Sequence, residues 1–218
     1  YIVASEDNSN DLDYVSDSAL TFNSGAIIDA AGSSADLTLA VPGAANSISA
    51  SKSLVIDNIA PIFSNVTEGS AISTSENDVD YQNFSDTLVI SWSGSDGGSG
   101  ISTYEYALGT TSGGTEFVSW TSAGTATADT LTGLSLTEGT TYYLSVRATD
   151  VAGNISSVSS ADGITIDLTA PAGTTVSDGT GADISYSGSD TTLSANWAAF
   201  TETVSGVQKY EYAIGTTS

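Results

Sequence analysis

The 218-residue sequence contains no cysteine, no histidine and no methionine. Without cysteine, the chain forms no disulfide bond and offers no thiolate nucleophile. Without histidine, it lacks the usual imidazole base and the commonest transition-metal ligand. Lys52 and Lys209 are the only lysines that could activate a serine, and each lies beside sequence that recurs elsewhere in the chain. These absences argue against an enzyme, and we expect no catalytic residue.

Positive charge is almost as scarce. The basic residues are Lys52, Arg147 and Lys209. Against them stand 26 acidic residues, so the formal net charge is −23. So few cations argue against binding to nucleic acid or to an anionic membrane surface. No apolar run approaches the roughly eighteen residues of a membrane span, so we expect no membrane insertion in this segment. Carboxylates and asparagine side chains are the hard oxygen ligands that calcium prefers, which makes calcium the expected cofactor.

Several segments alternate apolar and polar residues, as half-buried strands do. "TLVISWSG" at 87–94 places Leu88, Ile90 and Trp92 on one face. "TTYYLSVRATD" at 140–150 places apolar residues at every second position from Tyr142 to Ala148. No segment shows apolar residues at the three-and-four spacing of a helix over a useful length. The sequence therefore predicts an all-β fold.

Two phrases occur twice. "YEYALGTTS" at 104–112 returns as "YEYAIGTTS" at 210–218, and "LVIDNIAPIF" at 54–63 is matched by "ITIDLTAPAG" at 164–173. Tyr104 and Tyr210 lie 106 positions apart, and Asp57 and Asp167 lie 110 apart. A period of this size is the length of one β-sandwich. We expect three tandem domains at 1–57, 58–167 and 168–218, with the first and last truncated because the chain is a piece of a longer protein.

The central stretch resembles a fibronectin type III domain. A tryptophan lies in the second strand at Trp92, and "LTGLSLTEGTTYYLSVRATDVAGNIS" at 131–156 is similar to the stretch that runs into strand F of that family. The resemblance implies tandem immunoglobulin-like β-sandwiches. It assigns Leu134 to the core and Tyr142 to the corner tyrosine, whose hydroxyl bonds nearby backbone.

The first 57 residues resemble the closing half of a bacterial immunoglobulin-like repeat, through "LDY", "SGAIIDAAG" and "LVIDNIAP" in that order. Such repeats occur in giant calcium-dependent adhesins of Gram-negative bacteria. The resemblance implies an extracellular or cell-surface location. It also implies that the principal partners are neighbouring repeats of the same chain, with other fibre subunits as further candidates.

Acidic and amide residues at spacings of two indicate a calcium loop in "SEDNSNDLDY" at 5–14. The candidate ligands there are Asp7, Asn8, Asp11 and Asp13. The segment lacks the glycine and the final glutamate of an EF-hand. The alternative interpretation is a solvated acidic turn between two strands.

The boundaries between the expected domains supply a second set of candidate calcium ligands. They are Asp57 and Asn58 at the first boundary, Asp167 at the second, and Asp150 and Asn154 of "TDVAGN" at 149–154. A boundary carboxylate can share an ion with a loop of the next domain, although aspartate also caps turns without any ion. Asp96 and the run Glu76, Asn77, Asp78 and Asp80 are predicted to be solvated loop residues.

Aromatic residues outside the expected core offer a possible glycan-binding face, on which pyranose rings would stack. Trp120 and Phe117 in "TEFVSWTSAG" are the candidate ligand residues, with Tyr104 and Tyr143 as companions. The alternative for Trp120 is packing over a strand edge.

The sequence thus supports two function hypotheses. In the first, the chain is an extender or stalk segment of a large secreted or cell-surface bacterial adhesin or extracellular fibre, stiffened by calcium at the domain boundaries. In the second, one of the sandwiches binds carbohydrate, such as a cell-surface glycan or the substrate of a secreted polysaccharide-active protein. Half-domains that complete one another between subunits would be a third arrangement.

Overall fold

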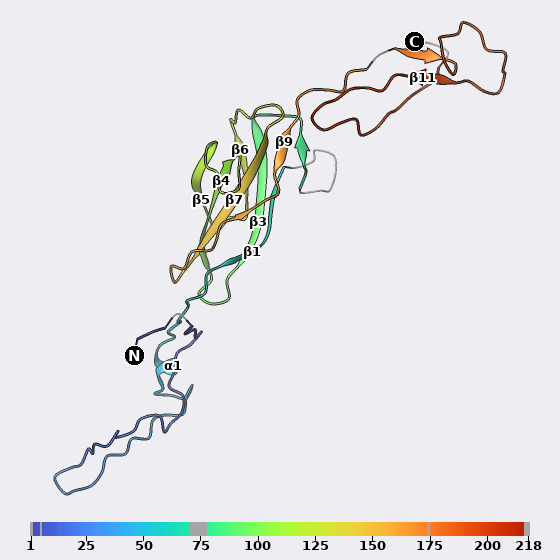
Figure 1. Ribbon diagram of the computed structural model, residues 1–218. Helices are drawn as coiled ribbons and strands as arrows, with labels where there is room; N and C mark the ends of the chain where they lie inside the picture. Colours follow the sequence, from blue (N-terminus) through green and yellow to red (C-terminus); the bar gives the residue numbers. More distant parts are fainter. Residues whose placement is uncertain (1, 5, 70–77, 174, 216–218) are drawn as a thin grey trace.

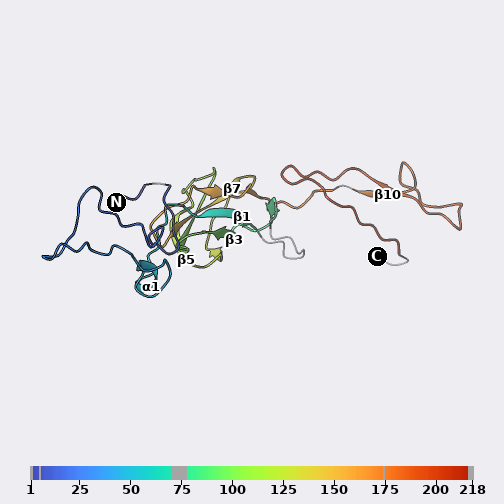
Figure 2. The ribbon, with the colours of Figure 1, turned by 90° about the horizontal axis from the view of Figure 1, so that it is seen from below.

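The structure, a computed structural model, describes residues 2–4, 6–69, 78–173 and 175–215. The chain is nearly all β, and its long strands gather in a central body that lies between two terminal segments (Figures 1 and 2). Within the described ranges, no helix has the length and apolar character needed to cross a bilayer.

The central body consists of two sheets. One contains three antiparallel strands in the order β1–β3–β6, with bounds Ile62–Glu68, Thr87–Ser95 and Ala128–Thr132. The other has the order β2–β9–β7–β4–β5, with bounds Tyr81–Gln82, Ile164–Ile166, Thr141–Asp150, Ile101–Gly109 and Val118–Gly124. The short strand β8 (Ser159–Ser160) also pairs with β7, and β2 pairs with β9 in the parallel direction. The strands of this body thus run from residue 62 to residue 166.

The inner faces of the two sheets share one hydrophobic core. Leu88, Ile90 and Trp92 of β3 are 0%, 0% and 4% exposed, as their alternation predicts. Tyr142 to Ala148 repeat the pattern on β7. Strands of the two sheets bury their apolar faces against each other, as a sandwich requires. The predicted all-β character and the buried faces of these strands are confirmed.

Tyr142 is fully buried, and its hydroxyl accepts a hydrogen bond from the backbone N–H of Thr137 at 2.9 Å. Leu134 is partly buried and packs against the core. Both residues therefore lie where the resemblance places them: the tyrosine fixes the turn before β7, and the leucine packs against the core near that turn.

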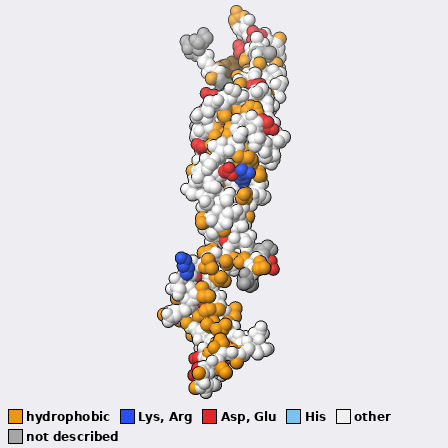
Figure 3. Space-filling view, turned by 90° about the vertical axis from the view of Figure 1, so that its left-hand side faces the viewer, with side chains coloured by type: hydrophobic (Ala, Val, Ile, Leu, Met, Phe, Trp, Pro, Cys, Tyr) orange, Lys and Arg blue, Asp and Glu red, His pale blue; other side chains and the backbone are white. Residues whose placement is uncertain are grey.

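The described part of the N-terminal segment, up to residue 57, contains isolated bridges such as Ser9 with Ile56, together with one helical turn, α1 (Ile48–Ser51). This turn was not predicted from the sequence. It begins at Ser47, whose hydroxyl accepts a hydrogen bond from the N–H of Ala50 at 3.1 Å, as an N-cap residue does. Hydrophobic side chains gather on the surface of this segment, at the lower end of Figure 3.

The C-terminal segment contains one antiparallel pair, β10 (Val176–Asp178) with β11 (Ala195–Trp197). Its aromatic side chains repeat an arrangement of the central core. The Trp197 ring lies 6.1 Å from the rings of both Tyr210 and Tyr212. The corresponding distances from Trp92 are 6.0 Å to Tyr104 and 5.8 Å to Tyr106.

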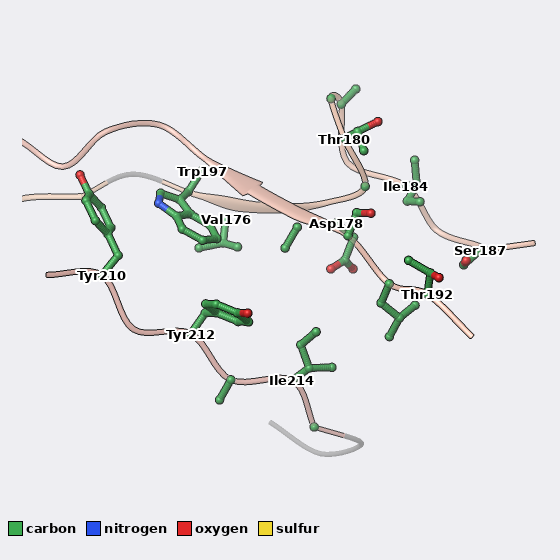
Figure 4. Close-up of a pocket in the computed structure, with 18 of the residues that line it drawn as sticks. Val176, Asp178, Thr180, Ile184, Ser187, Thr192, Trp197, Tyr210, Tyr212 and Ile214 are labelled. Atoms are coloured by element: carbon green, nitrogen blue, oxygen red, sulfur yellow. The ribbon is translucent and has the colours of Figure 1, made fainter. Parts of the chain in front are cut away.

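The two aromatic groups differ in burial. Tyr106 is 5% exposed, whereas Tyr212 is 76% exposed. In the C-terminal segment, Trp197, Tyr210 and Tyr212 line an open trough together with Val176 and Ile214 (Figure 4). In the central body, the corresponding space is filled by side chains of the other strands, such as β7.

Candidate metal centre

Three carboxylates converge at the boundary between the N-terminal segment and the sandwich. Oxygen atoms of Asp57, Asp96 and Asp150 all lie within 4.8 Å of one another. Asp57 ends the N-terminal segment, Asp96 follows β3, and Asp150 ends β7. The boundary trio, as we call these three residues, therefore joins one segment to two loops of the next body.

Asp57 is 8% exposed and is held by backbone groups on both sides of the boundary. Its Oδ1 accepts the N–H of Ile59 at 3.0 Å, and its Oδ2 accepts the N–H of Ser99 at 2.6 Å. Bonds from Ser99, through its side chain and its backbone, hold the pKa of Asp57 below its usual value. The carboxylate also lies directly over Gly98, where a Cβ atom would be 2.4 Å from Asp57 Cγ. A larger residue at position 98 would therefore displace the Asp57 carboxylate.

Asp150 is 2% exposed and organises the loop after β7. Its Oδ1 accepts the N–H groups of Gly153 and Asn154 at 2.6 and 2.7 Å. The Asn154 side-chain amide donates to Asp150 Oδ2 at 2.7 Å and to the Asp57 carbonyl at 3.0 Å. The side-chain nitrogen of Asn154 thus links this loop to Asp57 at the boundary. Asp57, Asp150 and Asn154 are all predicted candidate ligands, and the structure brings the three together.

Asp96 was predicted to be a solvated loop residue, and this prediction is wrong. Its Oδ2 accepts the N–H groups of Gly98 and Gly100 at 3.1 and 2.7 Å. Its Oδ1 is buried and has no hydrogen-bond partner among the described residues. A buried carboxylate oxygen without a partner, beside two further carboxylates, is an unfavourable arrangement unless protons or a cation neutralise it.

The second boundary repeats the geometry of the first. Asp167 accepts the N–H of Thr169 at 3.1 Å through Oδ1 and the N–H of Ser205 at 3.2 Å through Oδ2. The Ser205 hydroxyl also bonds this carboxylate and, as the largest cause, lowers the pKa of Asp167. Asp57 accepts the corresponding backbone N–H groups, those of Ile59 and Ser99.

The loop that meets each boundary aspartate also recurs. Glu202 accepts the N–H groups of Val204 and Gly206, as Asp96 accepts those of Gly98 and Gly100. Gly100 and Gly206 both have a positive φ, of 84° and 79°. Glu202 and the role of Asp96 were not predicted from the sequence. Their 106-residue spacing, equal to that of the repeated tyrosines, was the signal that could have identified them.

Within residues 6–14, the described part of the predicted calcium loop at 5–14, the candidate ligands lie in two different places. Asn8 accepts the N–H of Asn58 at 2.9 Å, and the Asn58 side chain donates to the Asp7 carbonyl at 2.8 Å. These three candidates therefore lie together near the first boundary. Asp13 instead accepts the Ser49 hydroxyl at 2.6 Å and the Gly43 N–H at 3.1 Å, and the Ser49 bond is the largest cause that lowers its pKa. Asp11 is exposed.

The candidate glycan-binding aromatics do not form one face. The Phe117 ring packs edge-on against the core residue Tyr142, with ring centroids 4.6 Å apart. The Trp120 ring lies under the guanidinium of Arg147, whose Cζ is 4.5 Å from the ring centroid. Tyr142 and Arg147 point to opposite faces of β7. Tyr104, named as a companion, is only 5% exposed and belongs to the core. Tyr143 is partly buried.

In the acidic run that begins at Glu76, Glu76 and Asn77 lie outside the described residues. Asp80 is exposed, as predicted, and its carbonyl accepts the N–H of Thr165 at 2.8 Å. Asp78 is exposed but belongs to a second carboxylate group, with Glu68 and Asp162.

Comparisons of this chain with protein-family models, with curated proteins and with solved structures give no match.

Proposed function

We propose that this chain is an extender segment, built from tandem immunoglobulin-like β-sandwich units of the fibronectin type III kind. It would serve a large bacterial adhesin or fibre outside the cell, with no catalytic role. The units would be 1–57, 58–167 and 168–218, and their principal partners would be neighbouring units of the same chain. Each unit would add length while contacting chiefly the next one.

The observation that carries this proposal is the recurrence at the two boundaries. Asp57 and Asp167 each hold a backbone N–H two residues later and a serine N–H in a loop about forty residues later. A boundary that is built twice in the same way gives successive units the same relative geometry. Repeated, directional contacts of this kind favour an extended arrangement over independent globular domains.

The aromatic groups give separate support for homologous units. Trp92 with Tyr104 and Tyr106 forms part of a closed core, and Trp197 with Tyr210 and Tyr212 takes up the same spacing in an open trough. Such an uncovered aromatic group is what the first strands of a sandwich present before the later strands cover them.

Calcium at the first boundary is part of this proposal. Two ligands on opposite sides of one calcium ion lie about 4.8 Å apart, because calcium–oxygen bonds are about 2.4 Å long. The three carboxylates of the boundary trio therefore fit a single coordination sphere. Calcium would neutralise the charge of the three carboxylates and bind the unpartnered Oδ1 of Asp96. It would therefore stiffen the boundary.

The carbohydrate-binding alternative has less support. It needs a continuous row of exposed aromatic rings. Phe117 and Trp120 contact opposite faces of β7, and the guanidinium of Arg147 lies over the Trp120 ring.

Small-angle X-ray scattering of the chain in calcium and in excess chelator tests this function. A compact chain of this length has a radius of gyration of roughly 17 Å. We expect a clearly larger radius and a rod-like profile in calcium, and a more flexible profile in chelator. A compact radius in calcium would contradict the extender function. An extended profile that chelation leaves unchanged would contradict only the calcium component.

The variant Asp96→Asn assigns the calcium effect to the boundary trio. Its amide oxygen can still accept the loop N–H groups, while the unpartnered position loses its charge. We expect the scattering of this variant to respond little to calcium. The control is Asp190→Asn, which removes the same charge from an exposed residue of the C-terminal segment. Equal calcium responses in the two variants would contradict the assignment.

A further inference from the structure

A second group of carboxylates lies where the two sheets of the sandwich meet. Oxygen atoms of Glu68, Asp78 and Asp162 are all within 4.8 Å of one another. Glu68 ends β1, which is an edge strand of the three-stranded sheet. Asp78 leads into β2 and Asp162 leads into β9, the two strands at one edge of the other sheet. The group therefore spans both sheets at the same edge.

Glu68 is unusual for an acidic residue because it is only 1% exposed. Both of its carboxylate oxygens are buried without a hydrogen-bond partner among the described residues. Asp78 and Asp162 are exposed, so they form the outer side of the group. Acidic side chains are almost never fully buried unless they are paired or bind a metal. Glu68 faces the negative charges of Asp78 and Asp162, and the backbone of Gly163 is the main group that favours its ionised form.

We propose that Glu68, Asp78 and Asp162 form a calcium site that links the two sheets of the sandwich. All three ligands are hard anionic oxygens, and their mutual separations fit one calcium coordination sphere. Glu68 supplies the buried ligand, and the two aspartates close the site from the solvent side. We refer to it as the sheet-edge site.

A proton is the competing way to neutralise Glu68. Burial, as the largest cause, raises the pKa of Glu68 to about 8, and the charges of Asp78 and Asp162 raise it further in the same direction. Without a cation, the side chain is therefore largely protonated near neutral pH. Calcium binding would displace that proton, since a metal ligand must be ionised. The test must distinguish an occupied calcium site from a protonated glutamic acid.

The two sites have different consequences. The boundary trio joins a segment to a sandwich, so calcium there changes the shape of the chain. The sheet-edge site lies within the sandwich, so calcium there raises its stability by binding the folded state alone. The proposal for the sheet-edge site thus does not depend on the extender function.

Calcium titration of the isotope-labelled chain, followed by NMR, measures calcium binding at each site separately through the amide signals of nearby glycines. Gly69 and Gly163 are the reporters for the sheet-edge site, since they adjoin Glu68 and Asp162. Gly98 and Gly153 are the reporters for the boundary trio. We expect calcium to shift the Gly69 and Gly163 amide signals, and magnesium at the same concentration to shift them much less.

Glu68→Gln is the decisive variant, because glutamine keeps the shape of the side chain and removes its charge. We expect it to abolish the calcium shifts at Gly69 and Gly163 and to leave those at Gly98 and Gly153 unchanged. Asp162→Asn, at an exposed position, should weaken calcium binding at least tenfold without affecting folding. The matched control Asp96→Asn should show the reverse pattern.

Two results would overturn the proposal. One is the absence of calcium shifts at Gly69 and Gly163 in the unmodified chain at millimolar calcium, which would leave Glu68 as a protonated acid. The other is that the shifts persist in Glu68→Gln. Loss of the boundary shifts alone would contradict the calcium component of the proposed function and leave the sheet-edge site standing.

Discussion

The Oδ2 atom of Asp57 accepts the backbone N–H of Ser99 at 2.6 Å across 42 residues of sequence. This bond joins the end of one segment to a loop at the near end of the sandwich. The same loop contains Asp96, so the bond also brings two acidic residues close together. This one contact therefore joins the two parts of the chain and also brings two carboxylates together at the junction.

Replacement of either boundary aspartate should loosen its own junction. Asp57→Ala removes the acceptor of the Ser99 N–H, and we expect amide hydrogen exchange at Ser99 to become about tenfold faster. Asp167→Ala should have the same effect at Ser205, because the bond recurs there. Exchange at the core residue Val146 serves as the control and should not change. Unaltered exchange at Ser99 would show that the bond does not order the loop.

Removal of the Tyr142 hydroxyl should destabilise the sandwich. Tyr142→Phe keeps the ring in the core and leaves the N–H of Thr137 without its acceptor. We expect the free energy of unfolding to fall by about 1–2 kcal/mol, measured by urea denaturation. Tyr81→Phe is the control, since Tyr81 is 46% exposed, and it should change stability by less than about 0.5 kcal/mol. Equal effects of the two variants would contradict the structural role of the hydroxyl.

Tyr106 should ionise at a higher pH than an ordinary tyrosine. Burial is the largest cause that raises its pKa from 10.0 to about 12, and its hydroxyl also donates to Asp129 at 2.8 Å. The folded state therefore retains a proton that the unfolded chain loses above pH 10.0. The contribution of Tyr106 to stability is complete below that pH and is lost as the pH rises through about 12.

Tyrosinate absorbance during an alkaline titration measures this ionisation. Tyr14 and Tyr104 also have raised pKa values, so Tyr106→Phe should remove one late-titrating tyrosine from the signal rather than all of it. In Asp129→Asn the Tyr106 signal should move to lower pH, because a negative charge no longer opposes ionisation. A titration in which Tyr106→Phe loses an ordinary early signal would contradict the prediction.

Trp120 and Arg147 should stabilise each other. The guanidinium lies 4.5 Å from the ring centroid and also bonds Glu105 at 2.8 Å. A double-mutant cycle with Trp120→Leu and Arg147→Met should give a coupling free energy of about 0.5–1 kcal/mol. Strictly additive effects would mean that the ring and the cation do not interact in solution. The ring would then be open to a sugar, and a glycan-binding assay of the unmodified chain would be the next measurement.

Local pattern predicted the strands of the central body. Leu88, Ile90 and Trp92 occupy every second position. A two-residue period predicts a strand with one buried face. The corner position of Tyr142 was expected from the resemblance to fibronectin type III domains, not from local pattern. Its hydroxyl bonds a backbone group only five residues away, so the contact is nearly local.

The carboxylate groups were harder to predict because their members are far apart in the sequence. Asp57 and the loop of Asp150 and Asn154 were named as boundary candidates that could share an ion, whereas Asp96 was assigned to solvent. Which loops meet depends on the order of strands in the two sheets, and that order is not encoded in any short segment. Glu68 gave no signal at all, because a glutamate at the end of a strand is ordinarily exposed.

By itself, the sequence determined the all-β character, the alternating core positions and the acidic, cation-poor surface. These properties follow from local spacing and composition, which act before any distant contact forms. Only the tertiary structure decided that Asp96 lies close to two other aspartates and that Glu68 is buried at the sheet edge. Both arrangements arise when strands distant in the chain pack together, because packing sets the distances between side chains and removes water from around them.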